Sequence, residues 1–278
     1  METGDPLVSA SWLLENISAP DVRVLDATWI PAFANADRTG RSSYEAAHIP
    51  GAAFFDIDEI ADSKTDLPHM MPDSVLFASR ARKLGIGDGN RIVVYDSNNF
   101  FASARAWWML RVMGHADVKV LDGGLAAWTD AGGALEDLPP VAVERHFTPR
   151  VRADLIKTAE QVLDANGMPV LDARPADRFY GRAPEPRADL RSGHIPGSTS
   201  VPSDSLMGAD GKMKSAEALK EVLPNGEEPV ICTCGSGVSA AVIALALARI
   251  GNYNASVYDG SWSEWGANAD LPIATDAG

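Results

Sequence analysis

Residues 48–51 and residues 194–197 have the same sequence, His-Ile-Pro-Gly. Upstream of each copy stands a second repeated motif, Val-Leu-Asp-Ala, at residues 24–27 and 170–173. The two motifs keep the same order and the same spacing in both halves of the chain. Such self-similarity indicates an internal duplication, and it decides how the rest of the sequence is divided.

Further matches follow downstream in the same order. They are residues 91–115 with residues 229–252, and residues 122–128 (DGGLAAW) with residues 259–265 (DGSWSEW). We therefore predict an N-terminal domain over residues 1–132 and a C-terminal domain over residues 153–278. The stretch 133–152 is rich in proline and charge, which is typical of a linker.

Each copy alternates short apolar runs with longer helical patterns. Residues 92–95 and 230–233 are continuous and rich in β-branched side chains, as buried parallel strands are. Each run leads through a loop of small residues into a helical pattern, over residues 102–113 and 238–250. This alternation predicts an α/β fold in which each domain has a parallel β-sheet flanked by helices.

The composition excludes several classes of function. The 278 residues are 46% hydrophobic and 22% charged, as in ordinary soluble globular proteins. The formal net charge of −14 disfavours nucleic acid and membrane surfaces as partners. The sequence has neither an apolar run long enough to span a membrane nor an N-terminal signal pattern, and it has only two cysteines, so we expect a cytoplasmic protein.

The segment 230–241, VICTCGSGVSAA, is the strongest chemical signal. A strand ends at Cys234, a helix starts five residues later, and Gly235 and Gly237 let the backbone turn so that several N–H groups point inward. A thiol placed there beside a helix N-terminus should ionise readily and react as the thiolate. The alternative is that Cys234 is only a small buried apolar residue. Cys232, two residues earlier in the strand, fits that packing role.

The duplication, the repeated His-Ile-Pro-Gly and the cysteine loop resemble the rhodanese-type sulfurtransferases. The resemblance spans residues 7–272 and implies two tandem rhodanese-like domains with a persulfide formed on Cys234. The loop is similar to that of the branch that uses 3-mercaptopyruvate, since the thiosulfate branch has two basic residues after the cysteine, where this chain has Gly235 and Ser236. The substrate-binding loop residues would be Gly235, Gly237, Val238 and Ser239, the last standing where the family more often has threonine.

The first copy lacks the thiol, because Asp96 stands where Cys234 stands in the second copy. A carboxylate cannot carry a transferable sulfur, so the first domain resembles the inactive N-terminal half of these enzymes. We expect it to brace the second domain and to form one wall of a cleft between them. Where the family often has an aromatic residue with a hydroxyl, this chain has Phe100 and Phe101.

Four arginines occur within residues 174–187 of this acidic chain. A guanidinium matches a planar carboxylate through two parallel hydrogen bonds. The resemblance implies that Arg178 and Arg187 hold the carboxylate and carbonyl of mercaptopyruvate. The alternative for each is a solvated loop charge. Arg174 and Arg182 fit that alternative better.

In the family, a serine, a histidine and an aspartate are proposed to relay a proton to the substrate. The resemblance assigns these roles to Ser236, His48 and Asp37. An oriented histidine can pass a proton, and an aspartate can fix its tautomer. The alternative is that the repeated His-Ile-Pro-Gly is a fold element, whose histidines are satisfied by hydrogen bonds.

The resemblance implies transfer of sulfur from 3-mercaptopyruvate to a thiol, a thioredoxin-like dithiol or cyanide, with release of pyruvate. We expect no metal and no organic cofactor. Thiosulfate as donor, or a non-enzymatic sulfur-relay or binding module, are the alternatives, although a binding module would not need the arginine pair. A cysteine phosphatase is disfavoured because Ala240 stands where that class needs an arginine.

Overall fold

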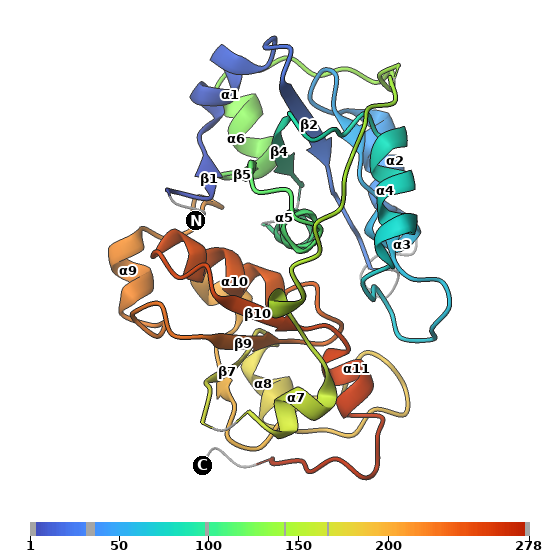
Figure 1. Cartoon of the computed structure of the whole chain (residues 1–278). Helices are drawn as coiled ribbons and strands as arrows, with labels where there is room; N and C mark the ends of the chain where they lie inside the picture. Colours follow the sequence, from blue (N-terminus) through green and yellow to red (C-terminus); the bar gives the residue numbers. More distant parts are fainter. Residues whose placement is uncertain (1–3, 32–36, 98–99, 142, 166, 276–278) are drawn as a thin grey trace.

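The computed structural model describes residues 4–31, 37–97, 100–141, 143–165 and 167–275. They form two five-stranded sheets, with strand orders β1-β5-β4-β2-β3 and β6-β10-β9-β7-β8. All pairings between neighbouring strands are parallel. The second order repeats the first strand for strand, which confirms the predicted α/β fold of two similar domains (Figure 1).

The elements of the first sheet and its flanking helices precede residue 131. They are β1 (Leu7–Val8), α1 (Ala10–Asn16), β2 (Val22–Asp26), α2 (Gly40–Ala46), β3 (Ala53–Phe54), α3 (Ile57–Ile60), α4 (Ser74–Lys83), β4 (Arg91–Tyr95), α5 (Ser103–Val112), β5 (Val118–Leu121) and α6 (Gly124–Asp130).

The elements of the second sheet follow residue 152. They are a 3₁₀ turn η1 (Ala153–Leu155), β6 (Ile156–Lys157), α7 (Ala159–Leu163), β7 (Val170–Asp172), α8 (Ala176–Phe179), β8 (Thr199–Ser200), a 3₁₀ turn η2 (Ser203–Leu206), α9 (Ala216–Lys220), β9 (Val230–Thr233), α10 (Ala240–Arg249), β10 (Ala255–Tyr258) and α11 (Ser261–Trp265).

Helices α5 and α10 join the two domains. They pack against each other at the centre of the molecule (Figure 1). Every residue of α5 is buried, and so is every residue of α10 except Arg249. A helix that is buried on all sides needs partners on all sides, so each of these helices covers its own sheet and the other domain's helix. One hydrophobic core therefore contains residues of both domains, while each sheet has a smaller core on its outer face.

The repeated His-Ile-Pro-Gly motif ties each domain's core to the segment that follows the domain's last helix. His48 forms a backbone bridge with Glu136, and His194 forms one with Ala274. The two imidazoles stack on Tyr44 and Phe179, with ring centroids 4.0 and 3.9 Å apart. Equivalent contacts in both domains show that the motif is an element of the fold.

No helix in the described part of the chain combines the length and the apolarity that crossing a lipid bilayer requires.

The loop after β2, which carries Trp29, is held against the start of α2 at Gly40. A methyl group at Gly40 would lie 1.8 Å from the backbone oxygen of Thr28. Because the atoms that this methyl group would meet all belong to the backbone of Thr28 and Trp29, the clash cannot be relieved by moving a side chain. We expect Gly40→Ala to lower the free energy of unfolding by about 3 kcal/mol, measured by urea titration. Gly89→Ala is the matched control, since a methyl group there meets no atom within 4 Å; equal losses in the two variants would contradict this account.

Candidate active site

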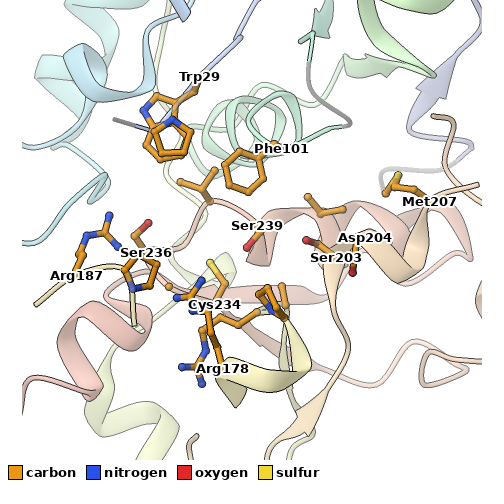
Figure 2. A pocket seen from close by; sticks show the side chains of 18 of the residues that line it. Trp29, Phe101, Arg178, Arg187, Ser203, Asp204, Met207, Cys234, Ser236 and Ser239 are labelled. Atoms are coloured by element: carbon orange, nitrogen blue, oxygen red, sulfur yellow. The ribbon is translucent and has the colours of Figure 1, made fainter. Parts of the chain in front are cut away.

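A cavity of about 650 Å³ lies between the two domains, beyond the carboxyl end of β9. The first domain contributes Trp29, Pro31 and Phe101, and the second contributes the remaining lining residues. Figure 2 shows the sulfur of Cys234 near the centre, between Phe101 and Arg178. This is the place where open α/β sheets bind ligands, outside the carboxyl ends of their strands.

Cys234 follows β9 directly and is 2% exposed. The next residues, 235–239, form the turn into α10. Within the described part of the chain, no group accepts a hydrogen bond from the backbone N–H groups of residues 235–239. Donors left free around a thiol, next to the N-terminus of a ten-residue helix, form a cradle for an anion.

The same loop in the first domain shows what such a cradle binds. Oδ1 of Asp96 accepts a hydrogen bond from the backbone N–H of Phe100 at 3.1 Å. Its Oδ2 accepts from the N–H groups of Ala102 at 3.0 Å and Ser103 at 2.7 Å. The first cradle is thus filled by its own carboxylate, whereas the cradle around Cys234 is free for an external anion.

The segment that follows the repeated Asp-Gly, residues 261–263, holds the cysteine loop through hydrogen bonds. The carbonyl of Cys234 accepts a hydrogen bond from the N–H of Trp262 at 2.9 Å. The carbonyl of Gly235 accepts from the N–H of Ser263 at 2.8 Å and from its hydroxyl at 2.7 Å. The N–H of Cys234 donates to Oγ of Ser261 at 3.2 Å. Helix α11 therefore holds the carbonyls away from the cavity and leaves the N–H groups facing it.

Arg178 and Arg187 both lie over the cysteine loop. A methyl group at Gly235 would be 3.4 Å from Nη2 of Arg178 and 4.0 Å from Nη1 of Arg187. Glu185 holds Arg178 through its Oε2, and Ser263 accepts a hydrogen bond from Arg187 at 3.3 Å. Burial lowers the pKa of Arg187, and the negative charge of the Cys234 thiolate opposes that shift.

The other two arginines of this segment have different surroundings. Arg174 is 1% exposed, is paired with Asp172 and Glu185, and lies over the ring of Trp262. Its guanidinium is therefore fully engaged in the core of the second domain. Arg182 is exposed over the ring of Tyr180 and does not line the cavity.

Ser236 does lie beside a histidine, but it is not the predicted one. Nδ1 of His69 is 3.0 Å from Oγ of Ser236, at hydrogen-bond distance. Nε2 of the same ring is 2.9 Å from Oδ1 of Asp58. Burial alone would raise the pKa of the Asp58 carboxyl, but hydrogen bonds from His69 and Trp29 outweigh burial and lower it. The carboxylate therefore stays ionised and orients the imidazole.

The prediction of His48 and Asp37 in this role is wrong. His48 is fully buried, and its ring nitrogens face the carbonyls of Tyr44 at 2.7 Å and Leu138 at 3.3 Å. Asp37 is exposed. The physical reason is that His-Ile-Pro-Gly has a structural role in both copies. It packs against the domain core, so its histidine faces inward.

Four residues of the site were missed by sequence reasoning: Trp29, Asp58, His69 and Glu185. None of them belongs to a repeated motif. His69 lies in the loop between α3 and α4, and only the packing of the two domains brings it to Ser236. The available signal was weak: His69 is one of five histidines, and it stands outside the repeated His-Ile-Pro-Gly motif.

The remaining predicted residues lie where the loop geometry requires. Gly235, Val238 and Ser239 line the cavity. Gly237 faces the first domain instead, with a φ angle of 76° that favours glycine. Cys232 is fully buried within β9, and burial together with the charge of Cys234 raises the pKa of its thiol. Cys232 is therefore a packing residue, as expected.

Fold and site together define a class: a two-domain α/β protein with a thiol in an anion cradle, facing two guanidinium groups and a Ser–His–Asp array. Comparison with known proteins agrees. The model of the rhodanese-like domain matches residues 9–131 and 155–268. The chain belongs to the rhodanese family.

Its relatives span nearly the whole chain. The 3-mercaptopyruvate sulfurtransferase of Escherichia coli K12 is 41% identical over 96% of this chain and 96% of that protein. The mitochondrial thiosulfate/3-mercaptopyruvate sulfurtransferase 1 of Arabidopsis thaliana is 38% identical over 98% of this chain and 79% of its own length. The crystal structure of SseA, a 3-mercaptopyruvate sulfotransferase from Escherichia coli, superposes with a TM-score of 0.84 and 37% identity over 93% of this chain and 99% of that one.

The two histidines can be separated by substitution. We expect His48→Ala to lower the free energy of unfolding by about 2 kcal/mol, since it removes buried packing and a hydrogen bond, while the folded variant keeps its sulfur-transfer rate within about twofold. We expect His69→Ala to lower that rate about 100-fold, because it removes a proton-transfer group. Urea titration and a steady-state sulfur-transfer assay check both. The reverse pattern, an inactive His48 variant and an active His69 variant, would assign the proton relay to His48 instead.

Proposed function

We propose that this protein transfers sulfur from 3-mercaptopyruvate to a thiol acceptor through a persulfide on Cys234. The observation that carries the proposal is the set of free N–H groups at residues 235–239 beneath Arg178 and Arg187. The guanidiniums suit a carboxylate next to a carbonyl, and the N–H groups suit an anionic sulfur on Cys234. The names of the relatives support this donor.

The first half-reaction moves one sulfur atom. The Cys234 thiolate attacks the thiol sulfur of 3-mercaptopyruvate, an S–S bond forms, and the C–S bond breaks with its electron pair on carbon. The resulting enolate of pyruvate takes up one proton at that carbon. Arg178 and Arg187 stabilise the carboxylate and the developing enolate oxygen. Ser236, which is hydrogen-bonded to His69, is placed to supply the proton.

The second half-reaction regenerates the thiolate. An acceptor thiolate attacks the outer sulfur of the Cys234 persulfide, and Cys234 leaves with the S–S electron pair. The cavity of about 650 Å³ extends past Cys234 toward Ser203, Asp204 and Met207, on the side away from Arg187 (Figure 2). After pyruvate leaves, this space admits a small thiol or the reactive cysteine of a thioredoxin-like protein.

Thiosulfate is the second candidate donor, because the Arabidopsis relative is named for both donors. Thiosulfate is a compact dianion, and Gly235 and Ser236 add no positive charge directly beside the thiol. The two arginines lie over Gly235 as a pair, which suits the adjacent carboxylate and carbonyl of mercaptopyruvate. We therefore rank thiosulfate as the poorer donor. A pure binding module would not use the free N–H groups and the arginine pair together.

We also propose a reducing compartment, the cytoplasm, since both cysteines are unpaired. The Arabidopsis relative is named as mitochondrial, which is a second reducing location. Fractionation of cells that express the protein decides between the two.

The donor is tested by intact mass and by product. Reduced protein incubated with 3-mercaptopyruvate should gain one sulfur atom and release one equivalent of pyruvate, whereas thiosulfate at equal concentration should load less than about a tenth as fast. Cys234→Ser should neither gain sulfur nor release pyruvate. Cys232→Ala is the control and should behave as the unchanged protein. Faster loading from thiosulfate would overturn the choice of donor.

The role of the arginines is tested within one loop. Arg187→Ala should raise the KM for 3-mercaptopyruvate about 30-fold, since it removes a charge-assisted contact of about 2 kcal/mol. Arg182→Ala is the matched control from the same segment, and its KM should stay within about twofold. Steady-state pyruvate release measures both values. An unchanged KM for Arg187→Ala would remove this residue from the site.

A further inference from the structure

One buried arginine of the first domain reaches into the second. Arg105 lies in the first turn of α5 and is fully buried, and its Nη2 is 2.7 Å from Oδ1 of Asp259, which is 3% exposed. The guanidinium also lies over the ring of Trp108, 4.4 Å from its centroid. A buried ion pair across a domain interface needs further hydrogen bonds to offset the loss of water around both charges. Those hydrogen bonds are made to the two loops that carry the site.

The first loop is the one that contains His69. The guanidinium of Arg105 donates to the backbone carbonyl of His69 through Nη2. Two residues further on, the N–H of Met71 donates to Oδ2 of Asp259 at 2.7 Å. His69 has a φ angle of 62°, in the left-handed region that non-glycine residues adopt at a cost. The ion pair therefore holds the backbone at two points directly after the strained His69, at its own carbonyl and at the N–H of Met71.

The second loop is the one that follows Cys234. Nη1 of Arg105 donates to the carbonyl of Gly237 at 3.3 Å. A methyl group at Gly237 would lie 2.9 Å from that Nη1 and 3.0 Å from the backbone oxygen of Asp259. Gly237 is adjacent to Ser236, so one guanidinium bonds the residue next to the serine and also the histidine that the serine faces.

We propose that Arg105 and Asp259 are positioning residues, which hold His69 at hydrogen-bond distance from Ser236 across the domain interface. This inference rests on the proposed function, in which that hydrogen bond carries the proton to the enolate of pyruvate. Arg105 does not line the cavity and acts only through the backbone of His69 and Gly237. Its loss should slow proton delivery and leave donor binding by Arg178 and Arg187 largely intact.

Arg105→Lys tests the proposal, because lysine keeps the charge but lacks the planar fork that reaches three acceptors at once. We expect kcat for pyruvate release from 3-mercaptopyruvate to fall at least about tenfold, with KM changed by less than about threefold. In a His69→Gln background the same substitution should change kcat by less than about twofold, since the residue it positions is already gone.

Arg111→Lys is the matched control. Arg111 lies on the same helix, is buried, and crosses the same interface to the carbonyl of Tyr253 at 3.3 Å. Its guanidinium lies over the rings of Trp107 and Tyr253, 4.5 and 5.1 Å from their centroids. We expect its effect on kcat to stay within about twofold, and to be the same with and without His69. A general loosening of the interface would affect both variants alike.

The imidazole resonances of His69, assigned by their absence in His69→Gln, give a readout that does not depend on activity. They should shift in Arg105→Lys and not in Arg111→Lys. Unshifted resonances in Arg105→Lys, or losses of kcat that multiply in the double variant, would overturn the proposal. Failure of the proposed function is a different result: the unchanged protein would release no pyruvate, and the resonances would still report whether Arg105 holds His69.

Discussion

The packing of α5 against α10 is the constraint on which the rest of the structure depends. Each helix is buried on nearly all sides, so neither domain can cover its core without the other. This shared core fixes the first domain's loops above the second domain's cysteine. Trp29, Phe101 and His69 reach the site only because the helices meet. The domain without a thiol therefore completes the site.

Duplication produced two similar loops that are used in opposite ways. In the first, the carboxylate of Asp96 accepts the hydrogen bonds of the turn and closes it. In the second, Cys234 is too short and too weak an acceptor to do so, and the N–H groups stay free. An unsatisfied cradle is costly in a folded protein, and that cost favours an anion as ligand. The loop of the first domain, which binds the carboxylate of Asp96, thus shows the kind of anion that the loop around Cys234 can bind.

Four arginines supply positive charge in and around the site of this acidic protein. Arg178, Arg187 and the buried Arg174 line the cavity, while Arg105 is buried behind it. Each of the buried two is paired with a carboxylate, Asp172 or Asp259, so that neither charge is left alone in the core. Glu185 accepts from both Arg174 and Arg178, which orders the outer guanidinium without removing its exposed face.

The sequence by itself determined the two-domain α/β fold, the reactive loop at Cys234 and the arginine segment, because those features are local. A strand, a turn rich in glycine and a helix set their own geometry over a dozen residues. Only the tertiary structure decided which histidine faces Ser236. His48 carried the recognisable motif, but a repeated motif serves the core that both copies share. His69 and Asp58 have no local pattern, because their role arises from contact between loops more than 150 residues apart, and the spacing within one loop carries no information about such contacts.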